Sequence, residues 1–157
     1  MEPDIVFAGS GRLIIVLHAM AAIVLIGATT HHALIAIGYL RGNFKERLAR
    51  IYATTTAVTY AITFALGLVA YPSFRYHVRA LYLDRYEPGV SNLFDIKENF
   101  AALGVPLVIA AFVLSRVMKP KEDKALAQGY AAIVVLTAAI VWFAVISGLV
   151  ISLARGM

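Results

Sequence analysis

The stretch LIIVLHAMAAIVLIGATTHHALIAIGYL, Leu13–Leu40, decides the fold of this chain. It contains no Asp, Glu, Lys or Arg, and about 20 mostly apolar residues already suffice for a helix to cross the roughly 30 Å hydrocarbon core of a bilayer. Three further stretches of this kind follow, at 51–71, 100–118 and 130–154. We therefore expect an all-α integral membrane protein, a bundle of four transmembrane helices that forms a single domain over residues 1–157.

The composition agrees with this reading. Apolar residues make up 61% of the chain and charged residues 15%, well outside the usual balance of a soluble domain. The first apolar stretch follows the acidic start Met1–Asp4 and is too long for the core of a signal peptide, so we expect it to be retained as a span. Because the chain has no cysteine, disulfides, Cys-ligated zinc, iron–sulfur clusters and covalently attached haem are excluded.

The basic residues are concentrated in the two short connections, 41–50 and 119–128, where Arg116 at the end of the third span is counted with the second. Eight Lys or Arg residues face three acidic residues there, so these connections account for the formal net charge of +5. The positive-inside rule then predicts that both connections are cytoplasmic. Both termini and the long connection 72–99 are expected outside, in the periplasm if the membrane is a bacterial inner membrane. The same distribution argues against a nucleic-acid partner, because the positive charge marks topology and anionic lipid.

The long connection 72–99 is expected to lie at the outer membrane surface. Its aromatic residues are typical of an interfacial belt. Pro72 is expected to start an amphipathic helix that runs to about Tyr86 and is followed by a turn. Ser91 or Asn92 is then expected to cap a further helix that leads into the third span.

Histidines inside a span are the residues most able to carry chemistry. His18 and His32 lie within about 40° of each other around the first helix and about 21 Å apart along it, whereas His31 points to nearly the opposite side. Neutral imidazole is a common axial ligand of haem iron. We therefore expect His18 and His32 to bind one or two b-type haems against the mostly small side chains that line the same face: Ala22, Leu25, Thr29 and Ala36.

A six-coordinate haem requires a second axial ligand. For His18 the expected partner is His77, and the neighbouring Arg75 and Arg79 are expected to meet haem propionates or lipid phosphates. His32 has no second histidine on the inner side. Its alternatives are Met118, Tyr60, an open coordination position, or His31 after local unwinding.

The second span carries hydroxyl groups at helical spacing. At matched depth these lie opposite His31 and His32, so a quinone pocket or a proton path is one interpretation. Hydrogen bonds to neighbouring backbone carbonyls, which hold helices together, are the other. In the third span, Pro106 is expected to leave the carbonyl of Ala102 free and to kink the helix. The hydroxyl-bearing residues are Tyr52, Thr55, Thr56, Thr59, Tyr60 and Thr63.

The segment LHAMAAIVLIG, Leu17–Gly27, resembles a first-helix pattern of small bacterial membrane proteins. These are the copper-resistance D-like proteins and the HemJ-type protoporphyrinogen oxidases, in which a Leu-His pair precedes small residues and a glycine nine positions after the histidine. Gly27 fits that spacing, whereas Leu25 stands where these families usually have an aromatic residue. The resemblance covers eleven residues and implies a haem b or metal-associated role for His18.

Two functions follow as hypotheses. The first is a membrane b-type haem protein, or a haem-bearing subunit of a respiratory complex, that transfers electrons to or from quinone; if the chain is an enzyme, it is an oxidoreductase. The second is a cofactor-free accessory subunit of a larger membrane complex, in which the histidines are structural. The expected partners are the lipid bilayer, other membrane subunits or a second copy of the chain, and quinone.

Overall fold

The computed structural model describes residues 8–155, and these form helices with no strand among them. A short 3-10 turn precedes the first of four long helical stretches. The elements are η1 (Ala8–Ser10), α1 (Gly11–Leu40), α2 (Glu46–Phe74), η2 (a π-helix, Arg75–Leu83), α3 (Asp84–Tyr86), α4 (Pro88–Val117) and α5 (Lys124–Ala154).

The prediction of four apolar helices is confirmed. The described chain has four helices long and apolar enough to cross a membrane. α1, α4 and α5 have 30, 30 and 31 residues, about 45 Å each at 1.5 Å per residue, which exceeds the hydrocarbon thickness. Large apolar side chains such as Ile23 and Leu153 are 70% and 88% exposed, as expected of surfaces that contact lipid. These features indicate a multi-pass membrane protein.

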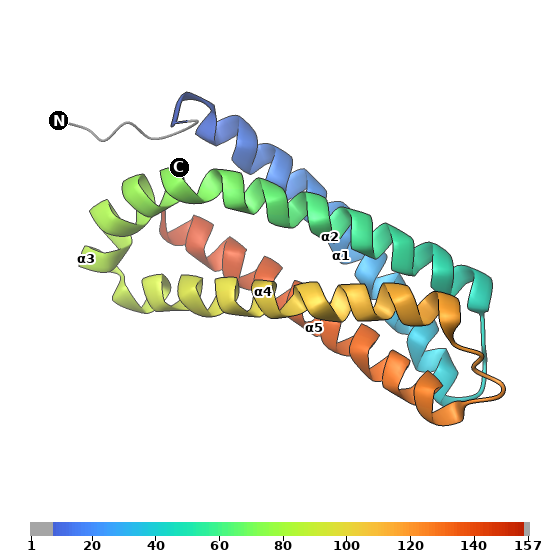
Figure 1. Ribbon diagram of the computed structural model, residues 1–157. Helices are drawn as coiled ribbons and strands as arrows, with labels where there is room; N and C mark the ends of the chain where they lie inside the picture. The colour runs from blue at the N-terminus through green and yellow to red at the C-terminus, as the bar shows by residue number, and fades with distance from the viewer. Residues whose placement is uncertain (1–7, 156–157) are drawn as a thin grey trace.

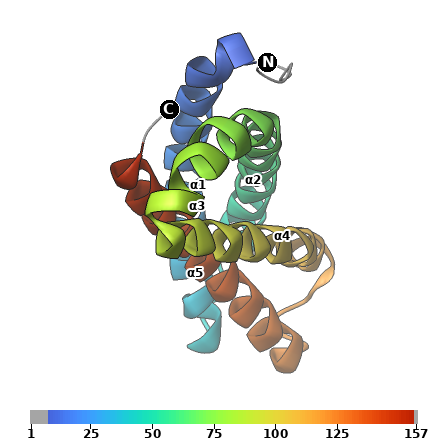
Figure 2. The ribbon, with the colours of Figure 1, turned by 90° about the vertical axis from the view of Figure 1, so that its left-hand side faces the viewer.

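The helices form an elongated bundle in which each contacts two main neighbours (Figure 1). α1 packs against α2 and α5, and α4 packs against α5 and α2. The α1–α2 and α4–α5 connections lie together at one end of the bundle, and the turn between α3 and α4 lies at the other. α1 also begins at that second end, where Gly11 lies against Ser73. Figure 2 views the bundle from there.

No new helix begins at Pro72, contrary to the prediction. α2 continues through Pro72 into η2 and α3, so one helical stretch runs from Glu46 to Tyr86. Proline removes only one backbone donor and crowds the preceding turn. The wider π-helical turns that begin at Arg75 accommodate this disturbance without ending the helix.

The start of α4 also differs from the prediction. Glu87 is the only non-helical residue between α3 and α4, and Pro88 occupies the first turn, where a missing backbone donor costs nothing. Ser91 does not cap the helix, because its hydroxyl donates to the Asp84 carboxylate. The segment 72–99 is therefore divided between two long helices, and the residues 88–99 belong to the third spanning helix.

Candidate functional site

His18 lies on α1 and faces α2. Its Nδ1 atom is 2.9 Å from the backbone carbonyl oxygen of Thr63. Because a carbonyl oxygen only accepts, Nδ1 must carry the proton, and the Nε2 lone pair is left for another partner. Gly67, one turn beyond Thr63, gives the ring its space: a Cβ added there would lie 3.3 Å from His18 Cε1.

His32 has a different environment. Its side chain is 2% exposed, and its Nε2 atom lies 2.6 Å from the hydroxyl of Tyr130 on α5. Tyr130 is itself fully buried. Whichever of the two groups donates, this bond occupies His32 Nε2. The interior around His32 is filled by close packing between α1 and α5.

The two histidines face different helices although they share one side of α1. α1 and α5 cross rather than run parallel (Figure 1), so a single face of α1 meets α2 at one depth and α5 at the other. Of the other residues on this face of α1, Leu25, Thr29 and Ala36 are all buried, so the face is used for helix packing. The two histidines of the predicted stripe are directed at different helices, His18 at α2 and His32 at α5.

His77 and His18 are not brought together. His18 lies beside Gly67, and His77 is ten residues further along the same helical stretch, about 15 Å in axial rise. His77 Nδ1 instead lies 3.1 Å from the carbonyl oxygen of Ser73, and its ring is perpendicular to that of Tyr76. The two imidazoles cannot ligate one iron atom in this arrangement.

The two arginines of η2 have separate surroundings. Arg79 donates to both carboxylate oxygens of Asp95 on α4, at 2.6 and 2.7 Å, and lies 3.5 Å from Asp84. This bidentate pair compensates the charge of Arg79 within the chain. Arg79 therefore already has a carboxylate partner, whereas Arg75 is exposed.

Tyr60 links α2 to α4. Its hydroxyl donates to the backbone carbonyl of Ala101 at 2.6 Å, and Gly104 gives it room, because an added Cβ would overlap the hydroxyl. Pro106 lies within unbroken α4. Pro106 was expected to leave the carbonyl of Ala102 without its helical donor. The carbonyl that accepts from Tyr60 is that of Ala101, one residue earlier. Tyr60 therefore serves helix packing and is not directed at His32.

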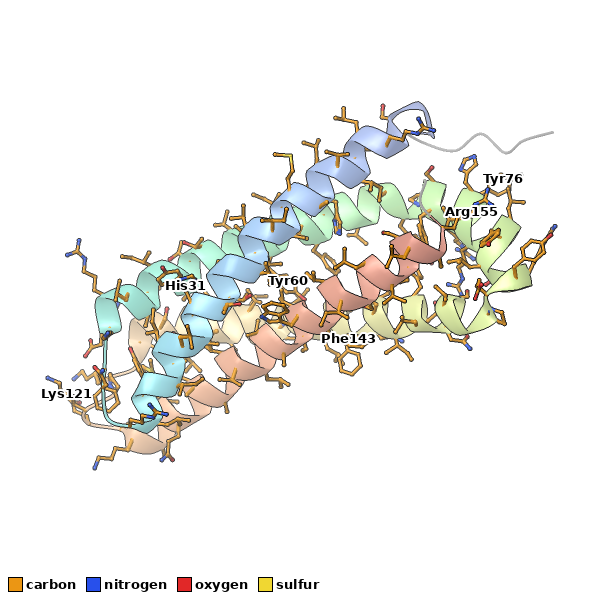
Figure 3. The ribbon with its side chains drawn as sticks, turned by 180° about the vertical axis from the view of Figure 1, so that it is seen from behind. His31, Tyr60, Tyr76, Lys121, Phe143 and Arg155 are labelled. Atoms are coloured by element: carbon orange, nitrogen blue, oxygen red, sulfur yellow. The ribbon has the colours of Figure 1, made fainter. Side chains whose placement is uncertain are left out.

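Most of the remaining threonine hydroxyls of the second helix bond to their own backbone. Thr55, Thr59 and Thr63 each donate to the carbonyl four residues earlier. His31, the exposed histidine labelled in Figure 3, behaves similarly: its Nδ1 lies 2.8 Å from the carbonyl of Gly27. The His31 ring stacks on Tyr52 with 5.6 Å between ring centroids. In the inner half of α2, Thr56 is the exception, because its buried Oγ1 atom has no hydrogen-bond partner.

The sequence reasoning missed a pair of charged residues on α4, Lys97 and Glu98. Lys97 is 18% exposed, bonds to Glu98 at 3.1 Å, and reaches α5, where its Cε lies 4.0 Å from a Cβ added at Gly148. Both residues had been assigned to the outer connection. Because α4 starts at Pro88, Lys97 and Glu98 lie on a spanning helix.

A cavity of about 580 Å³ lies next to this group, between α2 and α4. Leu68, adjacent to Gly67, forms one wall, and Glu98 brings its carboxylate to the other. Two further polar residues, Tyr71 and Asn99, also line it. The cavity therefore combines apolar walls with hydrogen-bonding groups at the depth of His18. Its complete lining is Leu68, Tyr71, Phe94, Asp95, Glu98 and Asn99.

Within residues 8–155, no three side chains of the His, Asp or Glu type gather in a way that would hold a metal ion. Comparisons with protein-family models, with curated proteins and with solved structures found no match to this chain. Support for a function therefore comes from the contacts of His18, His32 and their neighbours.

Proposed function

We propose that this chain is a membrane-embedded electron-transfer subunit that binds a single haem b through His18 and exchanges electrons with quinone. The observation that carries the proposal is the 2.9 Å bond from His18 Nδ1 to the Thr63 carbonyl. In metal-ligating histidines, a hydrogen bond from the ring nitrogen that does not bind the metal fixes the tautomer and the orientation of the ring. It also makes the ligating nitrogen, here Nε2, more basic. The resemblance of Leu17–Gly27 to haem-associated membrane proteins points to the same residue.

The histidine nitrogens that could bind iron favour one haem over two. His18 keeps a free Nε2 and is half-buried beside Gly67, whereas Nε2 of His32 is already bonded to Tyr130. The second axial position is not filled by His77, which lies elsewhere. When bound, haem b supplies a one-electron acceptor and donor, and the chain's part is to hold and orient it through His18.

The cavity between α2 and α4 supports the quinone part of the proposal. Its volume of about 580 Å³ lies in the range of small-molecule sites. Tyr71 and Asn99 offer hydrogen-bond donors to quinone oxygens. The oxidation of a quinol releases protons, and the Glu98 carboxylate is the base that would accept one. Leu68, which follows the Gly67 that lies against His18, lines the same cavity as Glu98, so the proton acceptor and the haem ligand would occupy one region.

The proposed setting is a bacterial inner membrane, with both termini and the α3–α4 turn on the periplasmic side. The support is the excess of Lys and Arg in the α1–α2 and α4–α5 connections, which lie at one end of the bundle (Figure 1), as the positive-inside rule requires of cytoplasmic loops. In this orientation the haem and quinone sites lie near the outer surface.

The test is the visible spectrum of purified, dithionite-reduced protein produced with ample haem. We expect a Soret band and an α band of haem b, and their loss in His18→Ala. The matched control is His31→Ala, because this histidine lies on the same helix but is exposed and bonded to its own backbone. A colourless wild-type protein would overturn the proposal.

A cofactor-free accessory subunit is the second candidate. It is favoured by one observation: all four histidines already have a hydrogen-bond partner within the chain. In that case the exposed apolar faces of the helices contact larger membrane subunits as well as lipid. Stoichiometric partner chains that co-purify with a colourless protein would establish this alternative.

A further inference from the structure

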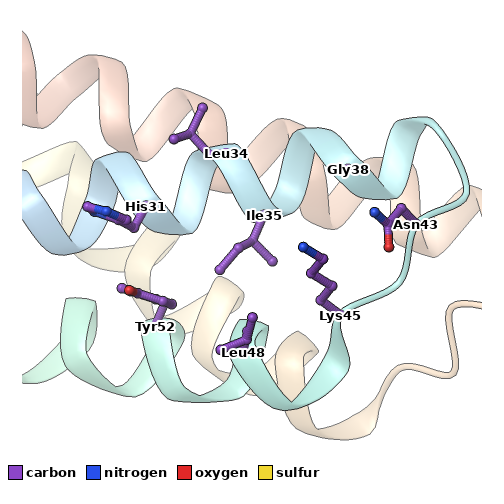
Figure 4. Close-up of a pocket in the computed structure, with 8 residues that line it drawn as sticks. All are labelled: His31, Leu34, Ile35, Gly38, Asn43, Lys45, Leu48 and Tyr52. Carbon is purple, nitrogen blue, oxygen red and sulfur yellow. The ribbon is translucent and has the colours of Figure 1, made fainter.

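A second cavity lies at the opposite end of the bundle, in the seam between α1 and α2. Its volume is about 310 Å³, and Figure 4 shows its lining. It opens toward the outside of the bundle, where lipid is expected, because Leu34 and Leu48 on its walls are 63% and 42% exposed. The lining residues are His31, Leu34, Ile35, Gly38, Asn43, Lys45, Leu48 and Tyr52.

The lining changes character along the seam. Asn43 and Lys45 supply an amide and an ammonium group at the end nearest the α1–α2 connection (Figure 4). Leu34, Ile35 and Leu48 then form apolar walls toward the bundle's middle, where the stacked rings of His31 and Tyr52 end the cavity (Figure 4). A site with a cation at headgroup depth and apolar walls below it has the polarity of an amphiphile that stands in the bilayer.

The charge at the polar end is available to a ligand. Within the described part of the chain no carboxylate lies at ion-pair distance from Lys45, and the adjacent Glu46 is instead 3.7 Å from Arg50. Arg41 at the end of α1 and Arg47 in the first turn of α2 add positive charge nearby. The local field therefore attracts an anion, and each basic residue near a membrane surface contributes about 1 kcal/mol to the binding of anionic lipid.

We infer that this cavity binds one anionic phospholipid from the leaflet that faces the α1–α2 connection. Its phosphate contacts the Lys45 ammonium group and the Asn43 amide, and its acyl chain lies along Leu34, Ile35 and Leu48. The inference does not rest on the proposed haem function, because it concerns the other end of the bundle and residues that the electron-transfer proposal does not use.

The chain's single tryptophan, Trp142, makes a site-specific test possible. In a Trp142→Phe background, Leu34→Trp places a fluorescent reporter on the cavity wall, and Leu48→Trp repeats the measurement from the opposite wall. Ile109→Trp on α4 is the control, since Ile109 is 58% exposed and outside the cavity. Each protein is reconstituted with brominated phosphatidylglycerol or brominated phosphatidylcholine at equal mole fraction, because bromine quenches a tryptophan only on contact.

We expect the cavity reporters to prefer brominated phosphatidylglycerol by about fivefold, the factor that one nearby cation supplies, and the Ile109→Trp control to show no such preference. Lys45→Gln should abolish the preference, and Arg47→Gln, which removes an equal charge outside the cavity, should retain most of it. Equal quenching by both lipids, or a preference that survives Lys45→Gln, would overturn the inference. Inorganic phosphate at matched ionic strength must leave the preference intact; its loss would assign the site to a free anion instead.

Discussion

The Nε2 atom of His32 on α1 lies 2.6 Å from the hydroxyl of Tyr130 on α5, and neither side chain is more than 2% exposed. This bond joins the first and last helices in the interior of the bundle. Tyr130 in turn packs against Tyr39, with 5.5 Å between ring centroids. A histidine that the sequence presents as a haem ligand is thus engaged as a structural link.

The first prediction concerns this link. Tyr130→Phe leaves His32 without its partner in a buried site, and we expect a loss of about 1–3 kcal/mol in the free energy of unfolding. A double-mutant cycle with His32→Ala should give a coupling energy of about 0.6–1.7 kcal/mol, the range for bonds between membrane helices. The measurement is unfolding in mixed micelles of increasing SDS fraction.

The control cycle pairs Tyr130→Phe with His31→Ala, whose exposed ring does not contact Tyr130. The two effects should be additive. A coupling energy near zero in the His32 cycle would show that the bond does not contribute to stability.

The second prediction concerns the close contact of α2 with α4. Gly104→Ala introduces a Cβ that overlaps the Tyr60 hydroxyl, and we expect it to destabilise the protein by about 1–3 kcal/mol. Tyr60→Phe in the same background removes the overlapping atom and should restore part of the loss. Gly129→Ala is the control, because nothing lies within 4 Å of the added atom and alanine is the better helix former. Equal thermal stability of the two alanine variants would contradict this account.

The third prediction concerns orientation. Because the chain has no cysteine, a single cysteine reports the side of the membrane on which it lies. In intact cells we expect a membrane-impermeant maleimide to label Gly89→Cys at the α3–α4 turn and not Lys121→Cys in the α4–α5 connection. After permeabilisation both should react. Labelling of Lys121→Cys alone in intact cells would reverse the proposed topology.

The sequence predicts the four spans because a bilayer imposes one simple requirement, a long apolar segment. It does not predict where α2 ends, because Pro72 is tolerated by the π-helical turns after it. It also does not predict which helix each histidine meets. The angle between His18 and His32 around α1 follows from the helical repeat, but the crossing of α1 with α5 depends on side chains distant in sequence, among them Tyr130.

The candidate site illustrates the same limit. The sequence singles out His18, because an imidazole within a span is costly and therefore conspicuous. Lys97 and Glu98 are missed, since charged residues that flank an apolar stretch are indistinguishable from those of a loop until the start of α4 is known.

The fourth prediction concerns Glu98 as a proton acceptor. Glu98→Gln removes the carboxylate from the cavity between α2 and α4, and we expect the reduction of the haem by a soluble quinol to slow by about tenfold or more. The haem content should not change, because His18 is retained. Stopped-flow spectroscopy at the α band gives the rate, and Glu122→Gln in the exposed α4–α5 connection is the matched control. Equal rates in both variants would exclude this role.

The proposed function depends on one haem for each chain, held by His18. The most direct measurement is the haem content of the purified protein by the pyridine haemochromogen assay, divided by the protein content from amino-acid analysis. We predict a ratio of about one, unchanged in His32→Ala and His77→Ala and close to zero in His18→Ala. A ratio of two, a ratio of zero, or haem that remains in His18→Ala would contradict the claim.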